Sequence, residues 1–308
     1  MSYRMFLYPG QGSQKIGMGA SLIAAYPEAS AIFESASDYA GYDIAKLCSD
    51  GPIEKLSQTL YTQPALFTVE AALTDVLKAR GVKPDAVAGH SLGEFGAWYA
   101  ADVYSFEEGF KLVAERGRLM DSADPDGIGT MAAVIGLTSD VVIDVCNGID
   151  GRVVVANDNS PMQQVISGEK DAVEQAGALL SEKGAKRVIP LKVSGAFHSP
   201  LMEDARAQFA EAVGNTTIND GALPVYANVQ AATVTDADDI RRCMVEQLTG
   251  TVRWTETVQA VIGDAEKSGG AELYEIGPGA VLAGLIKRID KSLAVRSVSD
   301  ADGIEEAI

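Results

Sequence analysis

A single pentapeptide, the sequence GHSLG at residues 89–93, limits what this chain can fold into more than any other stretch. The apolar run at 86–88 suits a β-strand, and the pattern of residues 92–101 predicts a helix. A G-x-S-x-G sequence between a strand and a helix is typical of a sharp turn that lifts the serine hydroxyl clear of a sheet. The helix start adds free backbone N–H groups, which suit a developing oxyanion. The pattern predicts a nucleophilic Ser91, although the pentapeptide alone also fits a Gly-rich turn with an ordinary serine.

The small number of histidines limits which residue could act as the base that activates this serine. The chain has two of them, His90 and His198, and histidine is the usual base for a serine nucleophile. His90 adjoins Ser91 on the turn, where neighbouring side chains diverge, so it is poorly placed to take the serine proton. His198 lies in a loop that precedes a helix expected from about Leu201. We predict that His198 is the base; the alternative is a histidine that caps or packs at a helix start.

A glycine-flanked loop follows the first predicted strand, at residues 5–8. The loop, PGQGSQ at 9–14, lies where α/β sheets place ligand sites. It lacks the glycine spacing of a dinucleotide fingerprint, and no G-K-[ST] follows, so it is not a phosphate loop. Gln11 could aim its backbone N–H or its side-chain amide at a substrate oxygen, or the loop could be a plain turn.

Charge and cysteine content exclude several classes of partner. The formal net charge of −18 argues against nucleic acid and anionic membrane surfaces, which need a basic face. The cysteines, Cys48, Cys146 and Cys243, are scattered and outside any C-x-x-C spacing, which favours a reducing compartment and no metal site. No apolar run is long enough for a transmembrane helix, and the N-terminus lacks a signal-peptide pattern. We expect a cytoplasmic protein.

The pattern of elements changes near residues 124–127. From there the chain reads strand (130–135), helix (139–146), strand (152–156), strand (163–167), helix (169–182) and strand (185–190). This βαββαβ order is the ferredoxin-like arrangement. We predict an α/β fold in which residues 1–126 and 193–308 form a large α/β-hydrolase-like catalytic subdomain with a mainly parallel sheet, and residues 127–192 form an inserted small ferredoxin-like subdomain.

Several short motifs occur together in a specific order. They are Pro9-Gly10-Gln11-Gly12-Ser13-Gln14, Thr62-Gln63-Pro64-Ala65, Gly89-His90-Ser91-Leu92-Gly93-Glu94, Glu115-Arg116-Gly117, Gly195-Ala196-Phe197-His198-Ser199-Pro200 and Tyr274-Glu275-Ile276-Gly277-Pro278-Gly279. Over essentially its whole length the chain resembles the malonyl-CoA:acyl carrier protein transacylases, the acyltransferases of fatty-acid synthesis. Acyltransferase domains of polyketide synthases and free-standing acyltransferases that serve such synthases share the same motifs.

The resemblance implies a reaction and its partners. Malonyl would pass from malonyl-CoA to Ser91 and then to the phosphopantetheine thiol of acyl carrier protein, in a ping-pong sequence without a cofactor. It implies an oxyanion hole from the backbone N–H groups of Leu92 and Gln11, and a histidine oriented by a backbone carbonyl around Gln247. It also places the site in the cleft between the two subdomains. We expect the chain to act as a monomer.

The resemblance also assigns the acyl pocket. It places Arg116, on a helix predicted at 106–120, opposite the free carboxylate of malonyl, which a guanidinium can grip through two hydrogen bonds. There are two alternatives: Arg116 could form a surface salt bridge, or Arg118 could bind the carboxylate in its place. Gln63 and His90 are expected to bind substrate in the same pocket. Phe197 would crowd an α-methyl group, as in related domains where Ala-Phe-His accompanies malonyl, so a preference for malonyl over methylmalonyl is expected.

Both implied substrates are acidic, like the chain itself, so we expect its basic residues to gather at the entrance. Candidate clusters are Lys186, Arg187 and Lys192, and Lys287, Arg288 and Lys291; each of these residues also fits a solvated charge.

Other functions stay open at this point. A free-standing acyltransferase for a polyketide synthase would use the same chemistry with a different carrier. A proofreading acyl hydrolase is less consistent with Arg116, and a catalytically silent carrier-binding subunit is less consistent with intact Ser91, His198 and Gln11.

Overall fold

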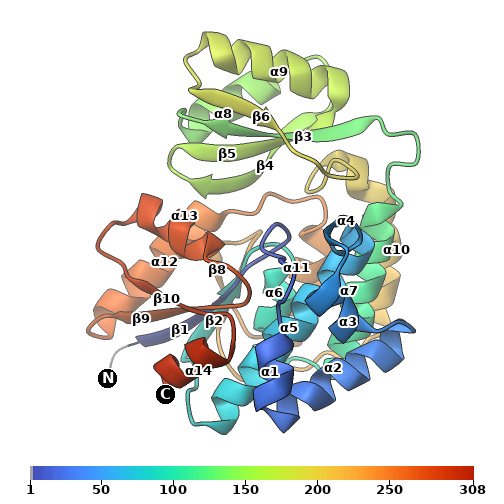
Figure 1. Cartoon of the computed structure of the whole chain (residues 1–308). Coiled ribbons are helices and arrows are strands. Elements are labelled where there is room, and N and C mark those ends of the chain that lie inside the picture. The colour runs from blue at the N-terminus through green and yellow to red at the C-terminus, as the bar shows by residue number, and fades with distance from the viewer. Residues whose placement is uncertain (1–2) are drawn as a thin grey trace.

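The computed structural model describes residues 3–308. Figure 1 shows a larger part built around one β-sheet, and above it a smaller part with a sheet and helices of its own. The chain enters the smaller part after helix α7 (Phe106–Asp121) and has returned to the larger part by helix α10 (Glu203–Gly214). The fold is therefore α/β, with the smaller part inserted into the chain of the larger one.

The larger sheet contains the strands that flank the two glycine-rich loops. Its strands are β1 (Tyr3–Tyr8), β2 (Ala86–Gly89), β7 (Val225–Ala227), β8 (Ala232–Val234), β9 (Ala271–Ile276) and β10 (Val295–Val298). They lie in the order β10–β9–β1–β2–β7–β8, and all neighbours are parallel except the antiparallel pair β7–β8. Tyr8 pairs with Gly89 at the ends of β1 and β2. The loops after these strands therefore start side by side at the carboxyl edge, where parallel sheets bind ligands.

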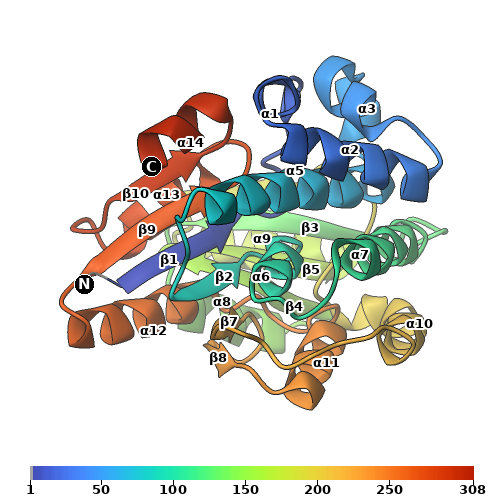
Figure 2. The ribbon, with the colours of Figure 1, turned by 90° about the horizontal axis from the view of Figure 1, so that it is seen from below.

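Helices cover both faces of this sheet, which explains why β1 is apolar at successive positions. Phe6 and Tyr8 pack into the core that contains α5 (Thr59–Ala79), whereas Met5 and Leu7 pack into the core that contains α12 (Trp254–Lys267). Figure 2 shows the sheet between these two helices.

The remaining helices of the larger part divide between these two cores. The α5 core takes in α1 (Ala20–Ala25), α2 (Pro27–Ala40), α3 (Ile44–Asp50), α4 (Ile53–Leu56), α6 (Gly93–Ala100), α7, the 3₁₀ turn η1 (Pro200–Met202), α10, α11 (Ala237–Glu246) and α14 (Ala301–Ala307); the α12 core takes in α13 (Val281–Ile289). The helices expected at 92–101 and 106–120 are present as α6 and α7, with ends that differ by at most one residue. The helix expected from Leu201 starts as the 3₁₀ turn and becomes α-helical at Glu203.

The smaller sheet is antiparallel throughout its described pairs. Its strands β3 (Gly129–Ile135), β4 (Val153–Ser160), β5 (Gln163–Glu169) and β6 (Arg187–Pro190) lie in the order β4–β5–β3–β6. Helices α8 (Ser139–Asn147) and α9 (Lys170–Glu182) pack on its outer face with a core of their own. Met131, Ala156 and Val165 instead join the α5 core, so the inner face of this sheet rests on the larger part.

Strand β4 is longer than the sequence pattern predicts. The apolar run ends at residue 156, but pairing with β5 continues to Ser160 through two register shifts. On its other side, Asp158 donates its N–H to the Val252 carbonyl at 2.9 Å. The prediction of a strand end at 156 is wrong because pairing on both sides outweighs the low strand propensity of these polar residues.

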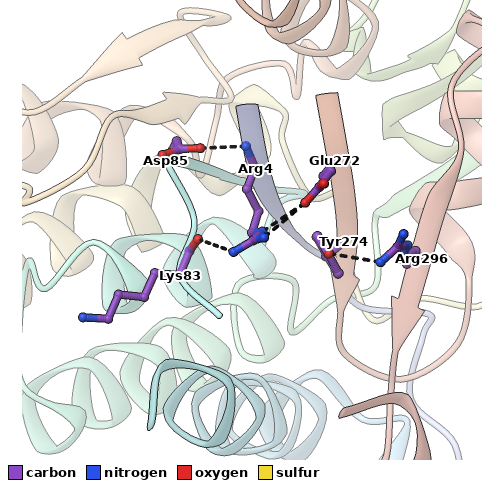
Figure 3. A network of polar contacts seen from close by, with 6 residues as sticks. All are labelled: Arg4, Lys83, Asp85, Glu272, Tyr274 and Arg296. Atoms are coloured by element: carbon purple, nitrogen blue, oxygen red, sulfur yellow. Dashed lines mark hydrogen bonds and ion pairs between the residues drawn. The ribbon is translucent and has the colours of Figure 1, made fainter. Parts of the chain in front are cut away.

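A polar network ties the amino-terminal ends of the strands together, at the edge of the sheet opposite the glycine-rich loops (Figure 3). The backbone N–H of Arg4 donates to the Asp85 carboxylate at 2.8 Å, and its guanidinium donates to Glu272 at 3.2 Å and to the Lys83 carbonyl at 3.4 Å. The Arg4 guanidinium also lies 5.9 Å from the centre of the Tyr274 ring. This network aligns β1 with β9 and with the start of β2.

No helix within residues 3–308 combines the length and apolar character that a bilayer crossing requires. Cys48, Cys146 and Cys243 are buried as free thiols.

Candidate active site

The turn after β2 has the geometry of a nucleophile elbow. Ser91 has a φ of 52°, a left-handed conformation that is strained for a residue with a side chain, by about 1–3 kcal/mol. A side chain at Gly89 would collide with the Gly93 carbonyl, and one at Gly93 would collide with the Tyr8 carbonyl. Both glycines are therefore required by the close approach of β1, β2 and α6.

Asn228, the first residue after β7, stabilises this turn through hydrogen bonds. Its Oδ1 accepts the Ser91 N–H at 2.8 Å, and its Nδ2 donates to the Gly89 carbonyl at 2.6 Å. Its own backbone N–H donates to Glu94 Oε2 at 2.6 Å. One side chain thus satisfies a backbone group on each side of His90 and opposes relaxation of the strained serine.

Ser91 and His198 lie in direct contact, although 107 residues separate them. The Ser91 Oγ is 2.7 Å from His198 Nε2, and His198 Nδ1 is 2.7 Å from the backbone carbonyl of Gln247. A carbonyl only accepts, so Nδ1 carries the proton and Nε2 is free to accept the serine proton. Burial, reinforced by the charge of Arg116, lowers the pKa of His198 to about 3. The imidazole is therefore neutral, as a base must be.

Arg116 lies beside this pair and is 0 % exposed. Its Nη1 donates to Gln63 Oε1 at 2.8 Å, and its Nη2 donates to Gln247 Oε1 at 2.8 Å and to Ser91 Oγ at 3.2 Å. Burial lowers the pKa of Arg116 to about 10, so it stays a cation near neutral pH. Arg118 is instead exposed and pairs with Glu115 at 2.6 Å, so it does not enter the site.

These groups border a cavity of about 120 Å³ between the larger and smaller parts. The larger part contributes the nucleophile, base and guanidinium, and the smaller part contributes Met131 from β3 and Asn157 from β4. Its lining residues are Gln11, Gln63, His90, Ser91, Leu92, Arg116, Met120, Met131, Asn157, Leu191, Val193, Phe197 and His198. Every substrate-binding residue expected from the sequence therefore borders the same cavity.

The loop after β1 also reaches this cavity. The Gln11 side-chain amide donates to Thr59 Oγ1 at 3.1 Å, which leaves its backbone for another partner. Within residues 3–308, the backbone N–H groups of Gln11 and Leu92 make no hydrogen bond. Two free donors at a cavity edge are suited to an oxyanion.

The side chain of His90 contacts residues other than Ser91. Its Nε2 lies 2.7 Å from Asn159 Oδ1, on β4 of the smaller part, and its ring packs edge-on against Trp254. Burial lowers the pKa of His90. The histidine therefore links the elbow to the smaller sheet, while Ser91 contacts His198.

Sequence reasoning missed the asparagines around the elbow. Asn228 directly follows the apolar stretch Val225–Ala227, and a polar residue at the carboxyl end of a strand is a signal that could have identified it. Asn157 and Asn159 lie in the part of β4 that the pattern did not predict as strand. Within the described residues, no group of three or more His, Cys, Asp or Glu side chains is placed to hold a metal ion.

A wider groove, of about 970 Å³, lies along α13. One side presents Lys287, Arg288 and Lys291, and the other presents Ser160 and Gln163 of the smaller sheet. Ser160 is three residues beyond Asn157 on β4, so the strand runs from the cavity to this groove. The other basic cluster expected from sequence consists of exposed Lys186, Arg187 and Lys192, and none of the three lines either space. Lys192 nevertheless lies between two residues of the cavity wall, Leu191 and Val193.

Comparison with known proteins gives a consistent result. The family model for the acyl transferase domain matches residues 5–304. A malonyl CoA-acyl carrier protein transacylase of Haemophilus influenzae is 45% identical over 298 residues, which is 96% of this chain and 94% of the relative. A protein of the same name from Bacillus subtilis is 41% identical, over 100% of this chain and 97% of the relative.

Solved structures agree with the sequence comparison. An acyl carrier protein S-malonyltransferase from Vibrio cholerae superposes with a TM-score of 0.95, at 41% identity over 100% of both chains. A malonyl-transacylase solved in complex with a type II polyketide synthase acyl carrier protein has a TM-score of 0.94, at 41% identity over 99% of both chains.

Proposed function

The chain belongs to the acyl transferase domain family, and we propose that it moves malonyl from malonyl-CoA to acyl carrier protein through an ester on Ser91. The relatives from Haemophilus influenzae and Bacillus subtilis are named malonyl CoA-acyl carrier protein transacylases, and the one from Vibrio cholerae an acyl carrier protein S-malonyltransferase. We assign the transfer by this chain to fatty-acid synthesis. The observation that carries the mechanism is the chain of contacts Ser91–His198–Gln247, with both distances at 2.7 Å, beside a buried cation.

The first half-reaction acylates the enzyme. Ser91 Oγ attacks the thioester carbonyl while His198 Nε2 takes the hydroxyl proton. The carbonyl oxygen becomes an oxyanion, which the free N–H groups of Gln11 and Leu92 are suited to accept. The intermediate collapses by breaking the C–S bond, and His198 returns the proton to the departing CoA sulfur.

The second half-reaction reverses these roles. The phosphopantetheine thiol of the carrier gives its proton to His198, and the sulfur attacks the ester carbonyl. The C–O bond to Ser91 breaks, and His198 returns the proton to Oγ. The backbone carbonyl of Gln247 keeps the imidazole in the same tautomer in both halves.

Arg116 selects an acyl group that carries a carboxylate. It is a buried cation at the same cavity as the nucleophile, and a guanidinium can hold a carboxylate through two hydrogen bonds. The cavity of about 120 Å³ fits a short acyl group. Phe197, buried at the same wall, supports a preference for malonyl over methylmalonyl, although one methyl group supplies only about 1–3 kcal/mol of discrimination.

The α13 groove is our proposed docking site for the carrier. An enzyme with a net charge of −18 repels an acidic partner unless cations gather locally. Lys287, Arg288 and Lys291 gather at this groove, and β4 connects it to the cavity. Charge reversal at Arg288 should raise the KM for carrier protein, whereas the same change at Lys186, outside the groove, should not.

We also propose how the chain divides into subdomains. Residues 1–126 and 193–308 would form the α/β-hydrolase-like catalytic subdomain, and residues 127–192 a ferredoxin-like subdomain that closes the cavity and one side of the groove. The β4–β5–β3–β6 order supports the ferredoxin-like description. We further propose a cytoplasmic, monomeric enzyme that uses no cofactor.

Steady-state kinetics test the two-step scheme. With malonyl-CoA varied at several fixed concentrations of carrier, a covalent ping-pong enzyme gives parallel double-reciprocal lines. Intersecting lines would contradict the scheme. Because one structural relative is a complex with a polyketide carrier, the assay should compare fatty-acid and polyketide carriers. A much higher kcat/KM with the polyketide carrier would assign the chain to that pathway.

A further inference from the structure

Arg116 is buried among neutral acceptors, which sets it apart from other arginines of the chain. Its terminal nitrogens donate to the side-chain carbonyls of Gln63 and Gln247, at 2.8 Å each, and to the Ser91 hydroxyl. Among the described residues no carboxylate lies within ion-pair distance, 4.0 Å, of its guanidinium. Exposed arginines such as Arg118 are instead paired with carboxylates.

One buried acid, Glu94, acts on this guanidinium without pairing with it. Glu94 is the acidic residue whose charge acts on Arg116, but its Oε2 is occupied by the Asn228 N–H at 2.6 Å. Burial raises the pKa of Glu94 to about 7, so its carboxyl group holds a proton for part of the time at neutral pH. Glu94 therefore neutralises the guanidinium only in part.

An amide oxygen and a carboxylate oxygen can both accept a guanidinium N–H, but only the carboxylate neutralises the charge. A glutamate in place of either glutamine would form a buried ion pair with Arg116, and a second anion would then gain little from binding there. The neutral glutamines thus leave the cation available for the acyl group.

We infer that Gln63 determines acyl specificity, because its neutral carbonyl positions Arg116 without supplying the counter-ion that the malonyl carboxylate must supply. The inference rests on the proposed function and extends it. It assigns the choice between anionic and neutral acyl groups to the charge at position 63 as well as to Arg116 itself.

Gln63 is the better of the two glutamines for a test. The backbone carbonyl of Gln247 holds His198, and its side chain donates to the Ser91 carbonyl at 3.0 Å. Among residues 3–308, the side chain of Gln63 hydrogen-bonds to Arg116 and, through Nε2, to the sulfur of Met120 at 3.4 Å, and to no other group. A glutamate of the same shape therefore adds charge and loses one weak N–H···S contact.

The experiment measures acylation rates with malonyl-CoA and with acetyl-CoA by quenched-flow mass spectrometry of the intact protein. Gln63→Glu should lower the malonyl-to-acetyl ratio of kcat/KM by at least about a hundredfold, because malonyl transfer falls much further than acetyl transfer. Gln63→Met is the matched control: it removes the hydrogen bond without adding charge, and it should shift the ratio by less than about tenfold.

The inference is overturned if Gln63→Glu keeps the wild-type ratio, or if Gln63→Met shifts the ratio as far as Gln63→Glu. If Gln63→Glu does not fold, Gln247→Glu introduces the same charge and keeps the backbone carbonyl, and it should shift the ratio in the same direction. Absence of any malonyl adduct on the wild-type enzyme would instead refute the proposed function.

Discussion

Replacing Asn228 by alanine should weaken both the fold and the acylation step. The substitution removes the acceptor of the Ser91 N–H and the donor to the Gly89 carbonyl, at 2.8 and 2.6 Å. Each buried group left without a partner costs about 1–3 kcal/mol, so the free energy of unfolding should fall by roughly 2–6 kcal/mol. The hydrogen bonds that hold Ser91 in its strained conformation, which costs about 1–3 kcal/mol, would then be lost. The residue could relax, and its hydroxyl would leave its alignment with His198.

Two measurements check this prediction. Urea denaturation gives the loss of stability, and single-turnover acylation by malonyl-CoA gives the loss of rate. The acylation rate should fall while the KM for malonyl-CoA changes little, because Arg116 and Gln63 remain in place. Asn219→Ala is the control, since Asn219 also donates to a backbone carbonyl, that of Val103 at 3.3 Å, but far along the chain from the elbow. The reasoning is wrong if Asn228→Ala acylates at the wild-type rate, or if Asn219→Ala is equally impaired.

Further substitutions probe the cation, the base and a buried acid. Arg116→Ala leaves the malonyl carboxylate unpaired, so malonyl kcat/KM should fall by a factor equivalent to about 3–5 kcal/mol while acetyl transfer is retained; parallel loss of both would indicate a structural role. His198→Ala should slow acylation at least about a hundredfold, and a larger effect of His90→Ala would identify the other histidine as the base. Burial raises the pKa of Glu70 well above 4.5, and within residues 3–308 its carboxyl oxygens have no hydrogen-bond partner. The folded protein therefore loses stability as pH rises above that value. Glu70→Met should therefore raise the melting temperature, more at about pH 9 than at about pH 5; an equal or reversed change would refute this.

The sequence predicted the local elements of the site well because each has a short-range signal. The G-x-S-x-G turn follows from its glycines, which the structure requires where β1, β2 and α6 meet. The helix of Arg116 follows from its apolar period, and α7 lies within two residues of the expected range. The two histidines could be distinguished because adjacent side chains on a sharp turn diverge.

Contacts between residues far apart in the chain could not be predicted from such short-range signals. Its place directly after a strand marks Asn228 as a candidate site residue. Its contacts with Gly89 and Ser91, however, depend on β7 lying next to β2, which no local signal shows. The full length of β4 was missed for a related reason: its last residues are held by pairing with β5 and by the Val252 carbonyl, not by their own propensity. The choice between Arg116 and Arg118, in contrast, had a local signal that was not used. The two residues lie on opposite sides of α7, and the apolar period that buries Leu112, Val113, Leu119 and Met120 also places Arg116 on the buried side.

The central claim is that Ser91 carries the acyl group. Intact-protein mass spectrometry after incubation with malonyl-CoA, without carrier protein, tests it most directly. The wild-type enzyme should gain one malonyl group, which peptide mapping should locate on Ser91, and Ser91→Ala should gain none while keeping its fold. A malonyl adduct on Ser91→Ala, or a wild-type adduct on another residue, would contradict the account.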